Sequence, residues 1–226
     1  MPTAEQIEIR SLALEFARGE IRPHGEAWDA AGRLPEEIFG KLAELGFLGM
    51  RVPESHGGLG LDEVTWALVL EALAWGDPAV ALAVSIHGGP VTEAVASRGS
   101  EVQKGRWLPA LAAGEALGAF ALSEPEAGSD PTRISATARP DGEGWILEGD
   151  KRWVTNGSRA GLLLTFLRTG GKPGEREGVS AFLVPGDAEG LTVRRRERTL
   201  GLRASETVTL EFQGVRVPAD GLLGLE

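Results

Sequence analysis

The sequence predicts an α+β chain of two parts, an all-α helical domain over residues 1–118 and a β domain over residues 119–226, built as an antiparallel barrel or sandwich. Two observations predict this fold class. Apolar residues recur at helical spacing between capping signals up to about Gly118. Beyond it, short apolar runs are separated by turns rich in Gly, Pro and Asp. A chain of 226 residues is long enough for one large core or two smaller ones.

Signals for the start of a helix recur through the first half. They are the capping box Thr3–Gln6, a helix-opening Pro35, Asp62, Asp77 with Pro78, and the capping box Ser100–Gln103. The predicted helices follow Thr3, span 36–45 and 63–75, open at 78 and end at His87, and run from 101 to about 114. Pro23 interrupts the first run, so the segment around Trp28 is a short helix or a loop, and 52–60 is a loop.

Predicted strands occupy the second half, where no amphipathic window of helical length remains. The short apolar runs lie at 146–147, 162–167, 179–184 and 207–212. Val208, Leu210 and Phe212 alternate with polar residues, which is typical of a half-buried antiparallel strand. All-α followed by all-β is an uncommon order.

Composition excludes several classes of function. The chain has 23 Lys and Arg against 33 Asp and Glu, a net charge of −10, which disfavours nucleic-acid binding. With no Cys and only three scattered His, we expect no disulfide and no metal site. No Rossmann or P-loop glycine motif is present. No apolar run approaches the length needed to cross a bilayer, so we expect a cytoplasmic protein without a membrane partner.

The segment LSEPEAGSD, just after the predicted domain boundary, concentrates groups suited to an anion. Ser123 and Ser129 supply hydroxyls, and Gly128 lets the backbone approach a ligand, so the amides of this turn suit a pyrophosphate. Glu124 and Asp130 permit either general acid–base chemistry or capping of backbone amides. We favour capping, because no His, Lys or second base is placed beside them.

The segment KRWVTNG, at residues 151–157, follows a predicted strand. Alternation along the strand puts Trp153 and Thr155 on one face, where a flat heteroaromatic ring would find an aromatic plane and one hydrogen bond. The alternative is a core tryptophan followed by a turn at Asn156–Gly157, and this segment alone favours that alternative.

His87 lies at the end of an apolar helix and precedes Gly88–Pro90. A lone histidine in that place is usually a C-terminal helix residue that interacts favourably with the helix dipole. A catalytic or substrate-binding role is the weaker alternative.

Taken together, ordered motifs along nearly the whole chain resemble those of the acyl-CoA dehydrogenase family. Residues 121–130 resemble its A-L-[ST]-E-P-x-A-G-S-D signature, and residues 151–157 resemble K-x-W-[IV]-T-N-G. Further matching segments are PESHGGLGL at 53–61, LPALAAGE at 108–115, LGLRASET at 200–207 and FQGVRVP at 212–218. Glu126 and Arg133 depart from the family pattern near the first signature.

The resemblance implies an FAD-dependent oxidoreductase that introduces an α,β double bond into acyl-CoA thioesters, with an electron-transferring flavoprotein as acceptor and a homo-oligomeric assembly. It implies that the middle β domain binds the flavin through Phe120, Leu122, Ser123, Gly128, Ser129, Trp153 and Thr155. In this scheme Ser129 meets the pyrophosphate and the substrate, Trp153 meets the isoalloxazine ring, and Thr155 meets its N5/O4 side. His87 is a further, weak substrate contact.

The resemblance also implies what these residues do not supply. Family members continue with a C-terminal four-helix domain that carries the catalytic Glu, and we expect that domain to be missing here, so no catalytic residue is assigned. Two alternatives therefore stand beside a dehydrogenase. One is a flavin-dependent oxidase or monooxygenase relative, and the other is a catalytically inactive binding or assembly module of the same family.

Overall fold

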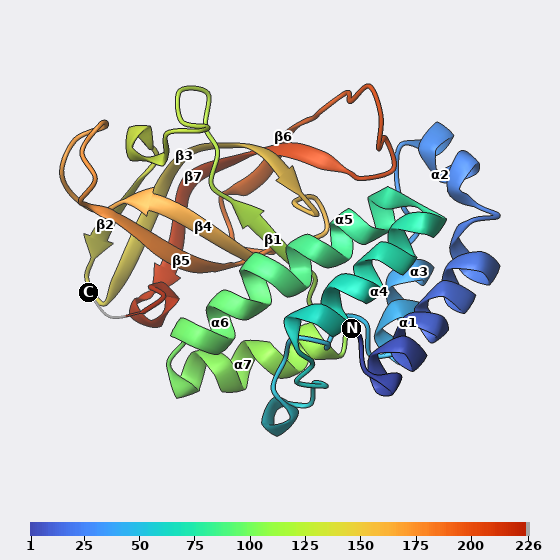
Figure 1. Ribbon diagram of the computed structural model, residues 1–226. Coiled ribbons are helices and arrows are strands. Elements are labelled where there is room, and N and C mark those ends of the chain that lie inside the picture. The colour runs from blue at the N-terminus through green and yellow to red at the C-terminus, as the bar shows by residue number, and fades with distance from the viewer. Residues whose placement is uncertain (225–226) are drawn as a thin grey trace.

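A helical part and a single β-sheet lie side by side in the computed structural model, which describes residues 1–224 (Figure 1). The helices are α1 (Ala4–Phe16), η1 (Ala17–Ile21), α2 (Gly25–Ala31), α3 (Glu36–Glu44), η2 (Glu54–His56), α4 (Glu63–Gly76), α5 (Pro78–Ile86), η3 (His87–Thr92), α6 (Glu93–Arg98) and α7 (Glu101–Ala112). The strands are β1 (Gly118–Ala121), β2 (Thr137–Asp141), β3 (Gly144–Thr155), β4 (Leu162–Arg168), β5 (Val179–Pro185), β6 (Leu191–Arg196) and β7 (Thr207–Pro218), with short turns η4 (Pro131–Arg133) and η5 (Ala219–Gly221). The predicted layout, helices first and strands second, is confirmed.

Side-chain caps fix where the helices begin. The Thr3 hydroxyl accepts a hydrogen bond from the Gln6 amide while the Gln6 side chain accepts one from the Thr3 amide, and Ser100 and Gln103 repeat the arrangement. Asp62 accepts two amide hydrogen bonds at the start of α4. Each cap satisfies backbone donors that a helix leaves without partners at its first turn, so these boundaries follow from the local sequence.

One continuous helix, Pro78–Arg98, is formed by α5, the π-helical turn η3 and α6. The prediction that it ends at His87 is wrong. Pro90 has no amide hydrogen, the wider π turn accommodates it, and the Thr92 hydroxyl donates a hydrogen bond of 2.8 Å to the His87 carbonyl.

The length of this helix overturns a second expectation. It has 21 residues and a mean hydropathy of 1.3, so by length and composition alone it is long and apolar enough to cross a membrane. However, 56% of its most apolar window is buried inside the protein, which is typical of a core helix. It is therefore weak evidence for a membrane span.

The seven strands form one mixed sheet in the order β1-β4-β2-β3-β7-β6, with β5 added along β4. Most neighbours are antiparallel, as predicted, but β1 pairs with β4 in parallel and β2 touches β4 in parallel at Thr137 and Arg168. The parallel pairing follows from the connection, because the chain leaves β1 and passes through the β2–β3 hairpin before it returns as β4.

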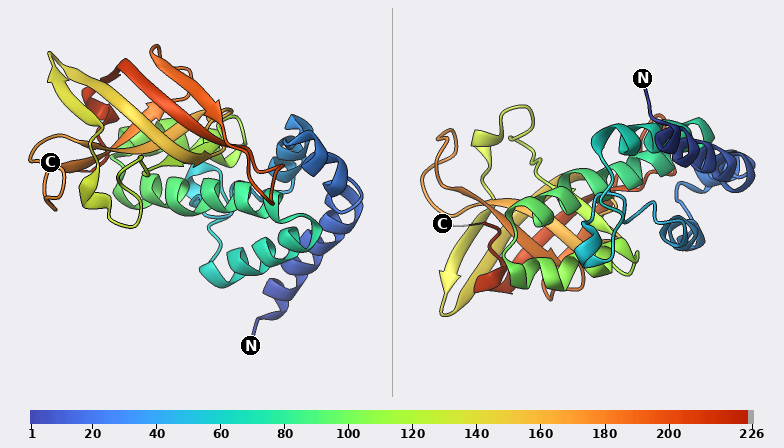
Figure 2. Two further views of the ribbon diagram at one scale, coloured as in Figure 1. Left: turned by 90° about the horizontal axis from the view of Figure 1, so that it is seen from above. Right: turned by 60° about the horizontal axis from the view of Figure 1, so that its bottom comes forward.

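The sheet buries both of its faces around β4, whose residues are nearly all buried. The inside of its curl holds Leu147, Leu163, Val208 and Phe212. The other face packs Leu162, Leu164 and Leu183 against Val95, Leu108 and Leu111 of α6 and α7. Figure 2 shows the α5–α6 helix running along this covered face. Alternate residues of β4 therefore enter two different apolar clusters, which explains why that strand is an unbroken apolar run.

Two side chains join the helical part to the edge strand β1 at Gly118. The buried His87 ring accepts the Gly118 amide at Nδ1 over 2.9 Å, and its Nε2 lies 3.1 Å from the Leu48 carbonyl, to which it donates. The Asn156 side-chain amide donates to the carbonyls of Gly118 and Ala83, at 3.1 and 3.0 Å. A Cβ added at Gly118 would stand 2.9 Å from Val91, so only glycine permits this close approach.

His87 is held neutral, which differs from the charged helix-end residue the sequence suggested. Burial lowers its pKa to about 4, against an ordinary value of 6.5. Both ring nitrogens are engaged within the protein, and the side chain is fully buried. This geometry gives no support to a substrate contact by His87.

We predict that His87 makes the fold sensitive to mild acid. Between pH 6.5 and pH 4 the unfolded chain binds a proton that the native ring rejects, so the free energy of unfolding falls as the pH falls. The expected loss from this ring is about 2 kcal/mol between pH 7 and pH 5. Urea unfolding at both pH values measures it.

The matched variants separate this ring from other titrating groups. His87→Gln should be less stable at pH 7 and should lose most of the pH dependence, whereas His24→Gln, at an exposed histidine, should retain it. If His87→Gln kept the full dependence on pH, this role of the buried ring would be refuted.

Candidate functional site

The predicted anion-binding segment forms an open loop directly after β1. Glu124 and Ala127 close a tight turn through reciprocal amide–carbonyl bonds of 2.8 and 3.3 Å. Ala127 is buried, whereas Gly128 and Ser129 are exposed, and a Cβ added at Gly128 would meet nothing within 4 Å. Ser123, at the start of the loop, is half-buried. The loop therefore presents its small, polar part to the outside.

Glu124 and Asp130 are both used for structure, as we favoured. Glu124 accepts hydrogen bonds from the Ser135 amide at 2.7 Å, the Ser135 hydroxyl at 2.8 Å and the Ala136 amide at 3.1 Å. Asp130 accepts the Thr132 amide at 3.1 Å. These contacts give both side chains a structural role in holding the loop.

The statement that no Lys stands beside these acids is wrong. Nζ of Lys151 lies 2.6 Å from Oε1 of Glu124, and both side chains are buried, at 0% and 2% exposure. Burial by itself would raise the pKa of Glu124, but the Lys151 ammonium and the Ser135 donors outweigh it and hold that pKa below its usual value. Nζ also donates to the Leu122 carbonyl over 3.3 Å. Lys151 therefore ties β3 to the loop.

A β-bulge turns Trp153 out of the sheet. Lys151 pairs with Leu210 and Val154 with Val208, so Arg152 and Trp153 together face a single residue of β7. Trp153 has a φ of 56° and is 59% exposed. The alternative of a core tryptophan is wrong. Simple alternation does not describe this segment either, because the bulge and the positive φ set the direction of the side chain.

The bulge and the loop are in direct contact. The amide of Arg152 donates a 2.7 Å hydrogen bond to the Ser123 carbonyl. Trp153 follows Arg152, and the half-buried Thr155 lies two residues further along β3. The structure thus brings Leu122, Ser123, Trp153 and Thr155 to one region. The turn that follows is formed as predicted, with Asn156 at a φ of 64°.

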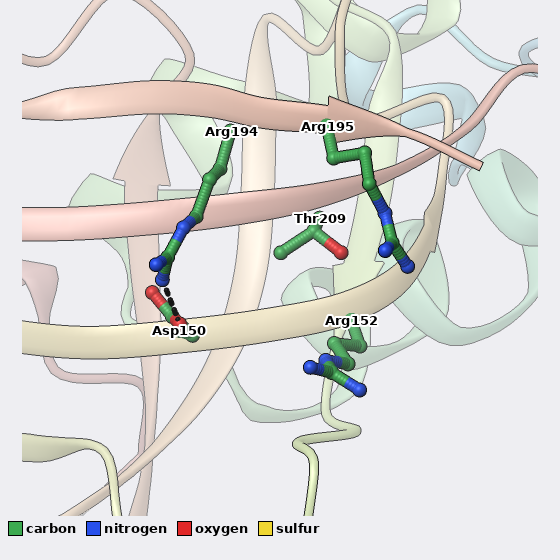
Figure 3. A pocket seen from close by; sticks show the side chains of 5 residues that line it. All are labelled: Asp150, Arg152, Arg194, Arg195 and Thr209. Carbon is green, nitrogen blue, oxygen red and sulfur yellow. Dashed lines mark hydrogen bonds and ion pairs between the residues drawn. The ribbon is translucent and has the colours of Figure 1, made fainter.

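A groove of about 480 Å³ lies on the same strands, lined by Asp150, Arg152, Arg194, Arg195 and Thr209 (Figure 3). Its cations are largely paired. Arg194 contacts Asp150 at 2.5 Å, and Arg195 contacts Glu197 at 2.5 Å. The groove is therefore a polar surface beside the bulge, and its lining holds three arginines against one carboxylate.

Phe120 lies away from the loop cluster. Its ring packs edge-on against Phe166, with centroids 5.4 Å apart. Phe166 lines a second cavity of about 610 Å³ between α6 and strands β4 and β5, with Arg98 and Leu223 also on its wall. Among residues 1–224, no group of three His, Asp or Glu side chains is placed to hold a metal ion.

The comparisons with known proteins agree with this geometry. Residues 3–115 match the family model of the acyl-CoA dehydrogenase N-terminal domain, and residues 119–215 match that of the acyl-CoA dehydrogenase middle domain. The chain belongs to the acyl-CoA dehydrogenase family. It is therefore a member of a family of oxidoreductases.

Relatives in this family cover the whole chain. An acyl-CoA dehydrogenase of Bacillus subtilis is 38% identical over 99% of this chain and 59% of its own length. The mitochondrial short-chain specific acyl-CoA dehydrogenase of Bos taurus is 36% identical over 99% of this chain and 54% of its own length. This chain thus spans between half and three fifths of these relatives.

Solved acyl-CoA dehydrogenase structures have the same fold. The acyl-CoA dehydrogenase of Geobacillus kaustophilus superposes with a TM-score of 0.94 at 36% identity, covering 100% of this chain and 59% of that one. A glutaryl-CoA dehydrogenase of Mycobacterium smegmatis in complex with FADH2 superposes with a TM-score of 0.91 at 36% identity, covering 100% and 56%.

Two buried cations of this site were not assigned from the sequence. Lys151 is the first residue of the segment at 151–157, and the sequence predicts no role for its side chain. Arg168, at the end of β4, is 5% exposed and donates to two backbone carbonyls of the loop and to two of the connection between β4 and β5. Arg168 directly follows the apolar run at 162–167, which is the available signal for a buried charge, whereas Lys151 stands between Asp150 and Arg152, where the sequence does not indicate burial.

We predict that removing one partner alone from the buried Glu124–Lys151 pair destabilises the fold. Lys151→Met leaves a carboxylate buried without its counterion and should lower the free energy of unfolding by about 3 kcal/mol. Arg139→Met, which removes the same charge from an exposed position of β2, should change it by less than about 0.5 kcal/mol. Urea unfolding followed by circular dichroism compares them. Equal, small changes in the two variants would contradict the importance of the pair.

Proposed function

We propose that this chain forms the flavin-facing part of an FAD-dependent acyl-CoA dehydrogenase that introduces an α,β double bond into acyl-CoA thioesters. The observation that carries the proposal is Trp153, an exposed indole that a bulge sets outward, next to Arg152, whose amide donates to the Ser123 carbonyl of the loop. Family membership and the superposition on an FADH2 complex support it.

The residues present fit the cofactor chemically. A flat ring needs an aromatic surface open to solvent, and Trp153 is 59% exposed. A pyrophosphate needs hydroxyl and amide donors on a backbone that it can approach, and the exposed Gly128–Ser129 part of the loop offers them. In this proposal Trp153 meets the ring, Ser129 the pyrophosphate, Leu122 and Ser123 the ring edge, and Thr155 its N5/O4 side.

The chain's own residues bind and orient in this mechanism. Bound FAD supplies the hydride acceptor, and these side chains set its position beside the substrate. Glu124 and Asp130 are engaged with Lys151 and Thr132, and His87 is buried and neutral, so we assign none of them as the base. We propose that a carboxylate outside these 226 residues takes the α-proton, as the family resemblance implies.

The partners follow from the same proposal. The substrate is an acyl-CoA, the electron acceptor is an electron-transferring flavoprotein, and the assembly is a homo-oligomer. One structural neighbour, with a TM-score of 0.94 and 32% identity, is described as an electron transferring flavoprotein of Acidaminococcus fermentans, in work on flavin-based electron bifurcation. That description supports a link between this fold and flavin electron transfer.

Titration of the purified chain with FAD, followed by flavin fluorescence, tests the proposal. Trp153→Ala should weaken FAD binding about tenfold through loss of the stacking contact. Trp75→Ala removes an equally accessible indole, 50% exposed on α4, and should leave the affinity unchanged. Absence of FAD binding by the wild-type chain would overturn the proposal for this chain, and equal effects of the two substitutions would overturn the role of Trp153.

A further inference from the structure

The segment that joins β1 to β2 must hold a defined shape with little regular structure. Between Ala121 and Thr137 it contains only the single turn η4, and most of its tip is exposed. Loops of this kind ordinarily sample many conformations. The loop and the bulge carry Ser123, Ser129 and Trp153, so their shape decides whether these groups face a ligand together.

A buried lysine anchors the beginning of the loop. Nζ of Lys151 contacts both the Glu124 carboxylate and the Leu122 carbonyl, at 2.6 and 3.3 Å. Through Glu124 the same network reaches the amides of Ser135 and Ala136, where the loop returns to the sheet. One ammonium group therefore connects both ends of the loop.

A buried arginine anchors the second half. The Arg168 guanidinium donates to the carbonyls of Ile134 at 2.8 Å and Thr132 at 2.6 Å. It also donates to the carbonyls of Gly170 and Glu177, at 3.2 and 3.1 Å. The first two acceptors lie in and directly after η4, and the other two lie in the connection between β4 and β5, so this side chain ties the main chain at η4 to that connection.

Stability alone does not explain this use of buried charge. A buried ion pair contributes little net stability compared with well-packed apolar side chains of similar volume. An apolar pair could fill the same space, but it could not direct the Leu122 carbonyl or the Ser135 amide. The buried charges therefore specify the backbone geometry of the loop.

The same lysine sets the bulge that carries Trp153. Lys151 is the last residue of β3 in register with β7 before the shift, and it points into the protein. Arg152 follows and donates to the Ser123 carbonyl, and Trp153 then turns outward. The ion pair, the loop and the exposed indole are thus consecutive parts of one arrangement.

We propose that Lys151 is a positioning residue, with Arg168 as a second anchor, that orders the loop and the bulge before any ligand arrives. The inference rests on the proposed function, because the ligand class is the flavin with its pyrophosphate. The two anchors preorganise the loop, because a loop already in its binding conformation loses less conformational entropy when the ligand binds.

A double variant tests the inference without leaving an unpaired buried charge. Glu124→Gln with Lys151→Met removes both charges and keeps an amide oxygen to accept from Ser135 and Ala136. We expect its thermal midpoint to stay near that of the wild type. In the free chain, amides of residues 126–135 should exchange with deuterium about tenfold faster. The dissociation constant for FAD should rise about tenfold.

Two further variants serve as controls for the double variant. Lys151→Arg keeps a cation that can reach Glu124. This variant should therefore retain much of the wild-type protection from exchange and much of the wild-type affinity for FAD. Arg139→Met, at an exposed position of β2, should change neither. If the double variant fails to fold, Arg168→Lys replaces it, because a lysine cannot reach all four carbonyls and should loosen residues 130–135.

The outcomes separate this inference from the proposed function. Unchanged exchange in the double variant, or faster exchange with unchanged FAD affinity, overturns the positioning role while leaving FAD binding intact. Faster exchange together with weaker FAD binding supports it. A wild-type chain that binds no FAD overturns the proposed function, and the exchange measurement on the free chain still decides whether the pair orders the loop.

Discussion

The double attachment of Gly118 holds the two halves of this molecule together. Its amide is bound by His87 from the long helix, and its carbonyl is bound by Asn156 from the turn after β3. These backbone groups belong to an edge strand that would otherwise expose them to solvent. Because β1 is fixed here against both helix and sheet, the loop that follows it starts from a defined point. A neutral imidazole suits this place, since it donates at one nitrogen and accepts at the other.

Beyond this attachment, buried polar contacts hold the conformation of the loop that forms the candidate site. Lys151 holds the loop through the Glu124 carboxylate, and Arg168 holds it through two backbone carbonyls. The exposed groups, Ser129 and Trp153, stand on the other side of this support. Such a layout lets a surface loop present hydroxyls and amides in one geometry, beside an indole on the neighbouring strand.

Family membership and local geometry answer different questions about this chain. The matches over residues 3–115 and 119–215 establish the acyl-CoA dehydrogenase family, and the 54% and 59% coverage of two relatives shows that those proteins contain more chain than this one. The geometry adds which side chains are available. Glu124 and Asp130 accept hydrogen bonds within the protein, and the chemistry we assign to this chain is binding and orientation.

Local sequence chemistry determined the helix starts, the order of helices before strands, and the polar, glycine-containing loop, because caps, periodicity and turn residues act over a few neighbouring positions. Only the tertiary structure decided the π turn at Pro90, the parallel pairing of β1 with β4 and the outward Trp153. It also decided that Glu124 meets Lys151, a contact between residues that are 27 positions apart. Burial and partner choice depend on which strands become neighbours, and short-range patterns carry no information about that.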